Sequence, residues 1–209
     1  MPPHHHHDDC GHEHQEHSQV GNEPNPQDNL YKYIDRENVI ALNASRPGYD
    51  VIKPWHNRQD ESVCIESDAD DQLILRIPFM GSVRLRGLLL KSGPVEHTPS
   101  KVLLFANEMN LDFSDVTNRS PTQEFNVAQA RGVGEYSLRT AKFSNLSSIS
   151  LYFPSSQGAD STRVYYVGFL GHWSERKEEP VITVYEAQPN ISDHDKIQGT
   201  EGNLNIPQL

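Results

Sequence analysis

Apolar and polar residues alternate along the middle of the chain, between Glu66 and Lys91. Over Gln72–Ile77 every second residue is apolar, which places three side chains on one face of a predicted strand: Leu73, Leu75 and Ile77. Pro78 ends this strand because it has no backbone N–H for the ladder, and a turn is predicted over residues 79–82. A second strand is predicted over Val83–Lys91. Two strands with one apolar face each need a further layer of structure to cover them.

The second predicted strand carries arginines on one face. Its alternation predicts one face with Val83, Leu85 and Leu89, and an opposite face with Arg84, Arg86, Leu88 and Leu90. Together with Arg76 on the preceding strand, Arg84 and Arg86 are suited to recognise an acidic partner surface through bidentate hydrogen bonds, so they are candidate partner-binding residues. The alternative is an ordinary solvent-exposed face with salt bridges across the sheet.

Further strands are predicted at short spacing, separated by Pro, Gly, Asn and Asp. They cover Ser62–Glu66, Lys101–Ala106, Tyr136–Thr140, Ser147–Phe153, Val164–Leu170 and Val181–Tyr185. Upstream, Asp35 ahead of Arg36-Glu37-Asn38 predicts a short helix, and the loop over Ser45–Glu61 is predicted to be held by Val51, Ile52 and Trp55. Many short strands without crossover helices predict an all-β fold, an antiparallel sandwich or barrel.

The ends of the chain differ in composition from its middle. Residues 1–28 contain Val20 as their one aliphatic residue after Met1, and such a segment buries too little apolar surface to offset the entropy of ordering it. Aromatic residues also vanish from Gln188 onward. We therefore expect one β-sandwich domain over residues 29–189, acting as a monomer, between disordered tails at 1–28 and 190–209.

Charge and hydropathy exclude several partner classes. The formal net charge of −11, with no basic run that includes aromatics, argues against nucleic-acid binding. No apolar run approaches the roughly 20 residues that cross a bilayer, and the polar N-terminus resembles no signal peptide, so no membrane partner is expected. Cys10 and Cys64 are not expected to form a disulfide, which fits a reducing compartment. The expected location is the cytoplasm and the nucleus.

The first 17 residues hold seven of the eleven histidines of the chain, together with Cys10. Imidazole and thiolate suit zinc, nickel or copper, and a flexible segment can bring several of them to one ion. The segment lacks the fixed ligand spacing and hydrogen-bond support of structural zinc sites. It either binds a metal such as zinc weakly, or engages a partner, or has no specific role. The candidate ligands are His4, His5, His6, His7, Cys10, His12, His14 and His17.

An acidic segment precedes the first central strand and contains Glu66, Asp68, Asp70 and Asp71. Clustered carboxylates suit Ca²⁺, although the spacing of an EF-hand loop is missing. The segment is otherwise a solvated turn that protects an edge strand with charge, or a partner-binding surface. We take the four residues as candidate partner-binding residues.

Four stretches of the sequence resemble the PITH domain, the proteasome-interacting domain that follows a thioredoxin module in thioredoxin-like proteins. The domain also occurs alone, without that module, in a small family of PITH domain-containing proteins, and this is the family that the chain resembles. The four stretches are ESDADDQLILRIPF, VRLRGLLLK, SKVLLFANEMNLDF and YYVGFLGHW, and the resemblance covers roughly Leu30–Ala187. It implies a jelly-roll sandwich like those of galactose-binding-type domains. It also implies docking on the regulatory particle of the proteasome, in cytosol and nucleus, with an adaptor or regulatory effect.

Catalytic motifs are missing from the sequence. It contains no G-x-S-x-G, no H-E-x-x-H, no Gly-rich phosphate loop and no C-x-x-C pair, so no enzyme and no required cofactor are predicted. Two alternatives to a protein-interaction module stay open. One is a zinc or copper buffer that acts through the histidine-rich tail. The other is a small-ligand or carbohydrate-binding jelly roll, which requires a concave site lined by aromatic residues such as Trp55 or Trp173.

Overall fold

The computed structural model describes residues 26–175. The predicted strand Val181–Tyr185, the tail at 190–209 and nearly all of the tail at 1–28 lie outside this range. The strands are β1 (Ile40–Leu42), β2 (Ile65–Glu66), β3 (Leu73–Ser92), β4 (Lys101–Ala106), β5 (Gln123–Asn126), β6 (Gly134–Ser137), β7 (Leu146–Phe153) and β8 (Arg163–Ser174). Short 3₁₀ helices are η1 (Tyr31–Tyr33), η2 (Arg36–Asn38), η3 (Gly48–Val51), η4 (Trp55–Asn57) and η5 (Val95–His97). Residues 26–175 contain no α-helix, and no helix among them is long and apolar enough to cross a membrane.

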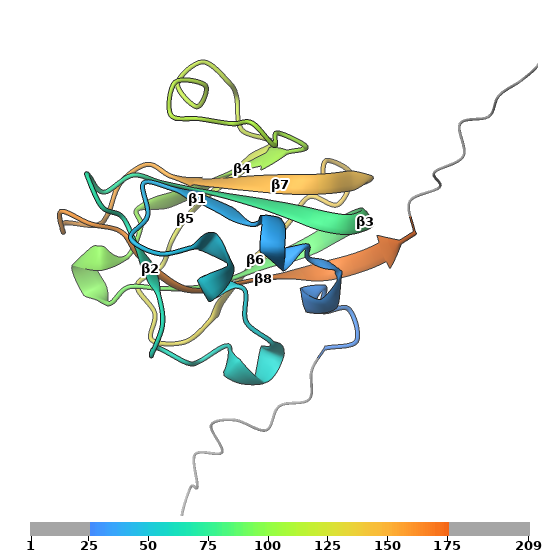
Figure 1. Cartoon of the computed structure of the whole chain (residues 1–209), viewed down its shortest axis with the longest axis horizontal. Helices are drawn as coiled ribbons and strands as arrows, with labels where there is room; N and C mark the ends of the chain where they lie inside the picture. Colours follow the sequence, from blue (N-terminus) through green and yellow to red (C-terminus); the bar gives the residue numbers. More distant parts are fainter. Residues whose placement is uncertain (1–25, 176–209) are drawn as a thin grey trace, which may run out of the picture. The chain divides into compact units, whose positions relative to one another are not determined.

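The strands form two layers that share β3. The first half of β3 pairs with β1 and β7, and β4 and β5 continue that layer beyond β7. The second half of β3 pairs with β8 and β6, and β2 pairs with the outer edge of β8. All of these pairings are antiparallel, and Figure 1 shows the layers stacked on one another. The predicted all-β antiparallel jelly-roll sandwich is therefore confirmed.

The turn predicted over residues 79–82 is wrong, because β3 continues through it as one strand. The ladder with β7 shifts its register between Pro78 and Val83, and an irregularity of this kind tolerates a proline. The strand passes close to β8 at Gly81, where an added Cβ would lie 2.5 Å from Trp173 Nε1. The segment therefore carries β3 from one layer into the other.

A second irregularity overturns the predicted faces of the Val83–Lys91 stretch. Leu85 pairs with Gly171 and Gly87 pairs with Leu170, so Arg86 has no counterpart on β8. One extra residue reverses the alternation that follows it. Val83, Leu85, Leu88 and Leu90 consequently face the main core, whereas Leu89 packs on the outer face with Tyr166 and Leu170.

The main core fills the space between the layers, and it includes the predicted row of Leu73, Leu75 and Ile77. The expected contacts of the loop over Ser45–Glu61 are confirmed. Val51 and Ile52 are buried in the main core, and Trp55 packs against the outer cluster around Leu89. A third cluster, on the outer face of the first layer, lies under the loop between β4 and β5: Ile74, Phe105, Leu111, Val116 and Tyr152.

The N-terminal part of the domain differs from the prediction. The helix expected near Asp35 is a single 3₁₀ turn, η2, and the apolar residues after it belong to β1 instead. Farther upstream, the chain lies along the edge of β8, where the Leu30 N–H donates to Phe169 O at 2.9 Å and the Gly171 N–H donates to Asp28 O at 2.8 Å. This segment covers an edge that β2 is too short to protect.

We predict that Gly171→Ala destabilises the domain by about 2–3 kcal/mol, because a Cβ there would overlap the carbonyl oxygen of Arg84 and lie 3.0 Å from Leu85 Cα. The overlap is with backbone held in a ladder, so no side chain can move aside. Thermal unfolding of the full chain measures the effect, at roughly 2–4 °C for each kcal/mol.

Gly132→Ala is the matched control, because its added Cβ would meet only Gln59 Nε2, at 3.9 Å. It is expected to change stability by less than about 0.5 kcal/mol. Equal melting temperatures for the two variants would contradict the close approach of β3 and β8.

Candidate functional site

The acidic segment begins with Glu66 in β2 and continues through the β2–β3 connection, at the end of the sandwich where β8 begins. Figure 1 shows this connection beside η5 and the loop between β7 and β8, at the left of the view. Gly93 N donates to Arg163 O at 3.1 Å, and Ser67 N donates to Thr162 O at 2.9 Å, so the three segments are joined by their backbones. The segment is thus one part of a compact end surface.

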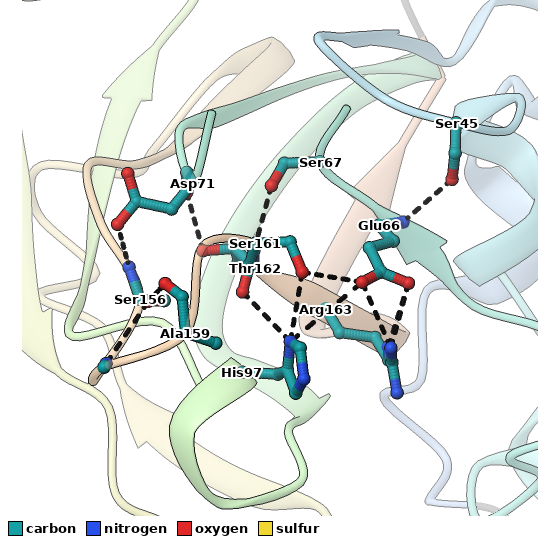
Figure 2. Close-up of polar contacts among 11 residues, drawn as sticks. Ser45, Glu66, Ser67, Asp71, His97, Ser156, Ala159, Ser161, Thr162 and Arg163 are labelled. Carbon is teal, nitrogen blue, oxygen red and sulfur yellow. Dashed lines mark hydrogen bonds and ion pairs between the residues drawn. The ribbon is translucent and has the colours of Figure 1, made fainter. Parts of the chain in front are cut away.

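Glu66 joins β2 to β8 and to η5 (Figure 2). Arg163 lies opposite it in the ladder and donates from Nε at 3.2 Å and from Nη2 at 3.0 and 3.1 Å. Ser161 Oγ donates to Glu66 Oε1 at 2.6 Å, and His97 Nδ1 lies 3.0 Å from that hydroxyl. The hydrogen bond from Ser161 and then those from Arg163 hold the pKa of Glu66 below its usual range. Glu66 therefore serves to fix three segments together.

Asp70 and Asp71 are also used within the protein. Asp70 Oδ1 accepts hydrogen bonds from Asn43 Nδ2 at 2.7 Å and from Gln72 N at 3.0 Å. Asp71 Oδ2 accepts from Ser156 N at 2.8 Å. Asp68 differs, because its side chain is exposed and has no hydrogen-bond or ion-pair partner within residues 26–175. No group of three or more acidic, His or Cys side chains in that range is arranged to hold a metal ion.

Two of the three arginines in the predicted row, Arg76 and Arg86, have partners within the protein. Arg76 donates to Leu111 O at 2.9 Å from Nε, and Arg86 pairs with Asp28 and with Glu135, the latter at 3.3 Å. Arg84 is exposed and has no partner in the described part of the chain. Partner binding by Arg84, by Arg86 and by the four acidic residues stays a prediction. The histidine and cysteine ligands proposed for metal, from His4 to His17, lie outside the described residues.

A pocket of about 430 Å³ opens beside η5, and its residues were not singled out from the sequence. They come from four separate segments, which the sequence predicted only as loops or as the ends of strands. The lining consists of Glu61, Ser92, Pro94, Val95, Gln129, Ala130, Arg131 and Tyr165. It combines hydrogen-bonding groups with apolar side chains, as ligand-binding pockets do.

A buried lysine holds two walls of this pocket together. The Lys91 side chain is 4% exposed, and its Nζ lies 2.9 Å from Glu61 Oε1 and 3.1 Å from Gln59 Oε1. The same Nζ donates to Arg131 O at 2.5 Å. An ammonium has three protons, and three acceptors from two loops therefore satisfy it fully. The cation fixes the spacing of the loops that carry Glu61 and Arg131.

A bulge and a strained residue shape the rest of the pocket. Lys91 pairs with Tyr166 and Ser92 pairs with Val164, so Tyr165 has no counterpart on β3, and its side chain lines the pocket. Val95 has a φ of +43° although it is β-branched, which costs about 1–3 kcal/mol. It is also 63% exposed, so packing does not offset that cost. The strain holds an apolar side chain at the mouth of the pocket.

Both tryptophans contact other side chains of the protein. The Trp55 ring packs under the Arg58 guanidinium at 4.1 Å, and the Trp173 ring stacks on Tyr33 with centroids 4.6 Å apart. Neither lines the pocket beside η5. Tyr165 is the aromatic residue in the pocket lining.

Comparisons with known proteins give a family and a fold. The PITH domain family model matches residues 20–189. PITH domain-containing protein 1 of Homo sapiens is 40% identical over 169 residues, covering 79% of this chain and 80% of the relative. The Danio rerio protein of the same name is 41% identical over the same shares.

Among solved structures, the CBM32-1 and CBM32-2 domains of ZmpB from Clostridium perfringens match with a TM-score of 0.54 and 13% identity, over 71% of this chain and 37% of that one. This likeness concerns the fold alone, and it agrees with the predicted galactose-binding-like jelly roll.

We predict that Glu66→Gln destabilises the domain by about 1 kcal/mol at pH 7, since the pair with Arg163 is partly exposed and screened by water. The folded-state pKa of Glu66 is lowered, so its stabilisation is present above the unfolded pKa of about 4.3 and is lost as the pH falls through the folded value. Denaturant unfolding at pH 7 and below pH 4 should therefore show a difference that shrinks in acid.

Asp68→Asn is the control within the same acidic segment, because its carboxylate has no hydrogen-bond or ion-pair partner within residues 26–175. It should stay within about 0.5 kcal/mol of the wild type at pH 7. A loss from Asp68→Asn as large as that from Glu66→Gln would show that overall charge, rather than the contacts of Glu66, stabilises this end.

Proposed function

Because the chain belongs to the PITH domain family, we propose that it is a protein-interaction module without catalytic activity that docks on the regulatory particle of the proteasome. The observation that carries the proposal is the family match over residues 20–189, which includes the whole described domain. The fold and the pocket lining fit a binding role, and no catalytic family is indicated. Within this proposal the chain acts as a monomer in the cytoplasm and the nucleus, as an adaptor or a regulator of degradation.

We place the docking surface at the end of the sandwich that carries η5, the acidic segment and the pocket beside η5. The Glu66, Asp71 and Lys91 hydrogen bonds described above fix these loops before any partner arrives. Loops that are already ordered lose little conformational entropy on binding, so more of the contact energy appears as affinity. Val95 provides an exposed apolar contact on this surface, in the lining of the pocket.

The histidine-rich segment is assigned a secondary role in this proposal. Once the sandwich has docked, residues 1–28 are tethered near the same partner and therefore meet it at a high effective concentration. Zinc is the metal that their imidazoles would contact there. No cofactor is required for docking itself.

The test of the docking surface is co-sedimentation of the full chain with purified proteasome. Val95→Asp replaces the exposed apolar side chain by a carboxylate, and we expect it to weaken binding at least about tenfold, or about 1.4 kcal/mol. Aspartate tolerates positive φ far better than valine, so the substitution should leave the melting temperature unchanged or raise it.

Met80→Asp is the matched control, because Met80 is 64% exposed and lies near the opposite end of β8, where Ser82 pairs with Ser174. It should co-sediment like the wild type. If Met80→Asp abolishes binding and Val95→Asp does not, the docking surface is at the other end. If the wild-type chain fails to co-sediment, the proteasome proposal itself is wrong.

A further inference from the structure

The charges around the pocket beside η5 do not cancel. Lys91 lies beneath the pocket, and its ammonium is 2.9 Å from Glu61 Oε1, so that cation and that anion compensate one another. Arg131 is exposed, and its guanidinium has no hydrogen-bond or ion-pair partner within residues 26–175. Arg131 is therefore the uncompensated charge among the side chains that line the pocket.

The backbone of Arg131 is fixed, whereas its guanidinium is exposed to solvent. Its carbonyl oxygen accepts a hydrogen bond from the buried Lys91 ammonium at 2.5 Å, which fixes the backbone of its loop. A guanidinium presents several donors in one plane, in a geometry that matches a carboxylate. An arginine on a fixed backbone, without a partner of its own, is suited to receive an anionic group from another molecule.

Part of the pocket lining is apolar. It includes Pro94, Val95 and Ala130, together with the aromatic residue Tyr165. Because Val95 is exposed at the cost of backbone strain, an aliphatic group from a ligand would bury surface that the protein itself leaves in water. The hydroxyl of Ser92 is a further hydrogen-bonding group in the lining.

We propose that this pocket binds a carboxylate next to an aliphatic side chain, presented by an acidic peptide segment of the docking partner. The inference rests on the proposed function, which places the docking surface at this end. A carboxylate is favoured over a phosphate, because a second negative charge would lie near Glu61 without a further cation to compensate it. The net charge of −11 does not prevent an acidic segment from binding, since at physiological salt ions screen charges that lie farther apart than about 8 Å, and the nearby charge of Arg131 acts at contact.

The test is a titration of the isotope-labelled full chain followed by NMR, with N-acetyl-leucine and N-acetyl-leucinamide as probes. The two probes share an aliphatic side chain, and only the first carries a carboxylate. We expect N-acetyl-leucine to shift the backbone amide signals of Ser92, Val95 and Arg131 in a saturable manner. N-acetyl-leucinamide should bind at least about fivefold more weakly, because it cannot pair with the guanidinium.

Arg131→Gln removes the guanidinium charge and keeps a polar side chain, so it should abolish the preference between the two probes. Arg139→Gln is the matched control, because the Arg139 side chain is also exposed and its guanidinium is without a partner in the described chain, but it does not line the pocket. It should leave the preference unchanged. Thermal unfolding of both variants confirms that neither perturbs the fold.

Three outcomes would overturn the carboxylate inference: equal binding of both probes to the wild type, a preference that survives in Arg131→Gln, or no saturable shift at the pocket. The first or third, with proteasome binding intact, would leave the proposed function standing. A carboxylate preference that depends on Arg131, in a chain that does not co-sediment with the proteasome, would support the pocket and reject that partner.

Discussion

The structure depends on one constraint, that β3 belongs to both layers of the sandwich. A single strand over Leu73–Ser92 pairs with β1 and β7 in its first half and with β8 and β6 in its second. Because the strand is continuous, its path between the layers and its register against β8 are coupled. The cost of that coupling is visible as irregular pairing after Pro78 and at Arg86, and as the close approach of the two backbones at Gly171.

The same constraint produces the candidate site. Where β3 ends, its register against β8 shifts again, and the unmatched residue is Tyr165, whose side chain lines the pocket. Lys91 lies beside this shift. Its ammonium donates to three acceptors outside β3, on the loops that carry Glu61 and Arg131. The end of β3 therefore also sets the distance between these two loops. The pocket is therefore a consequence of how β3 and β8 meet, rather than a feature of any one loop.

The alternation of apolar and polar residues correctly predicted several strand bounds and one buried strand face. The strand over Lys101–Ala106 has the predicted bounds, β7 begins within one residue of its prediction, and the apolar row from Leu73 to Ile77 faces the core. The turn after Pro78 and the face of Leu89 were wrong, because a bulge depends on the partner strand, which the alternation of one segment does not reveal. The edge strand β5 was missed because Gln123–Asn126 holds a single apolar residue. The pocket was missed for a related reason, since its residues come together from four separate segments.

Charge compensation separates the residues that hold the fold from those that can meet a partner. The acidic segment is the most conspicuous feature of the central sequence. The carboxylates of Glu66, Asp70 and Asp71 nevertheless accept hydrogen bonds from within the protein. A carboxylate already satisfied in this way gains little from a new cation, because the old contact must break first. A charge without an internal partner loses no such contact when it binds. Arg131 is inconspicuous in the sequence, but Lys91 fixes its backbone and its guanidinium has no partner among residues 26–175. By this criterion it is better placed for recognition than the acidic residues.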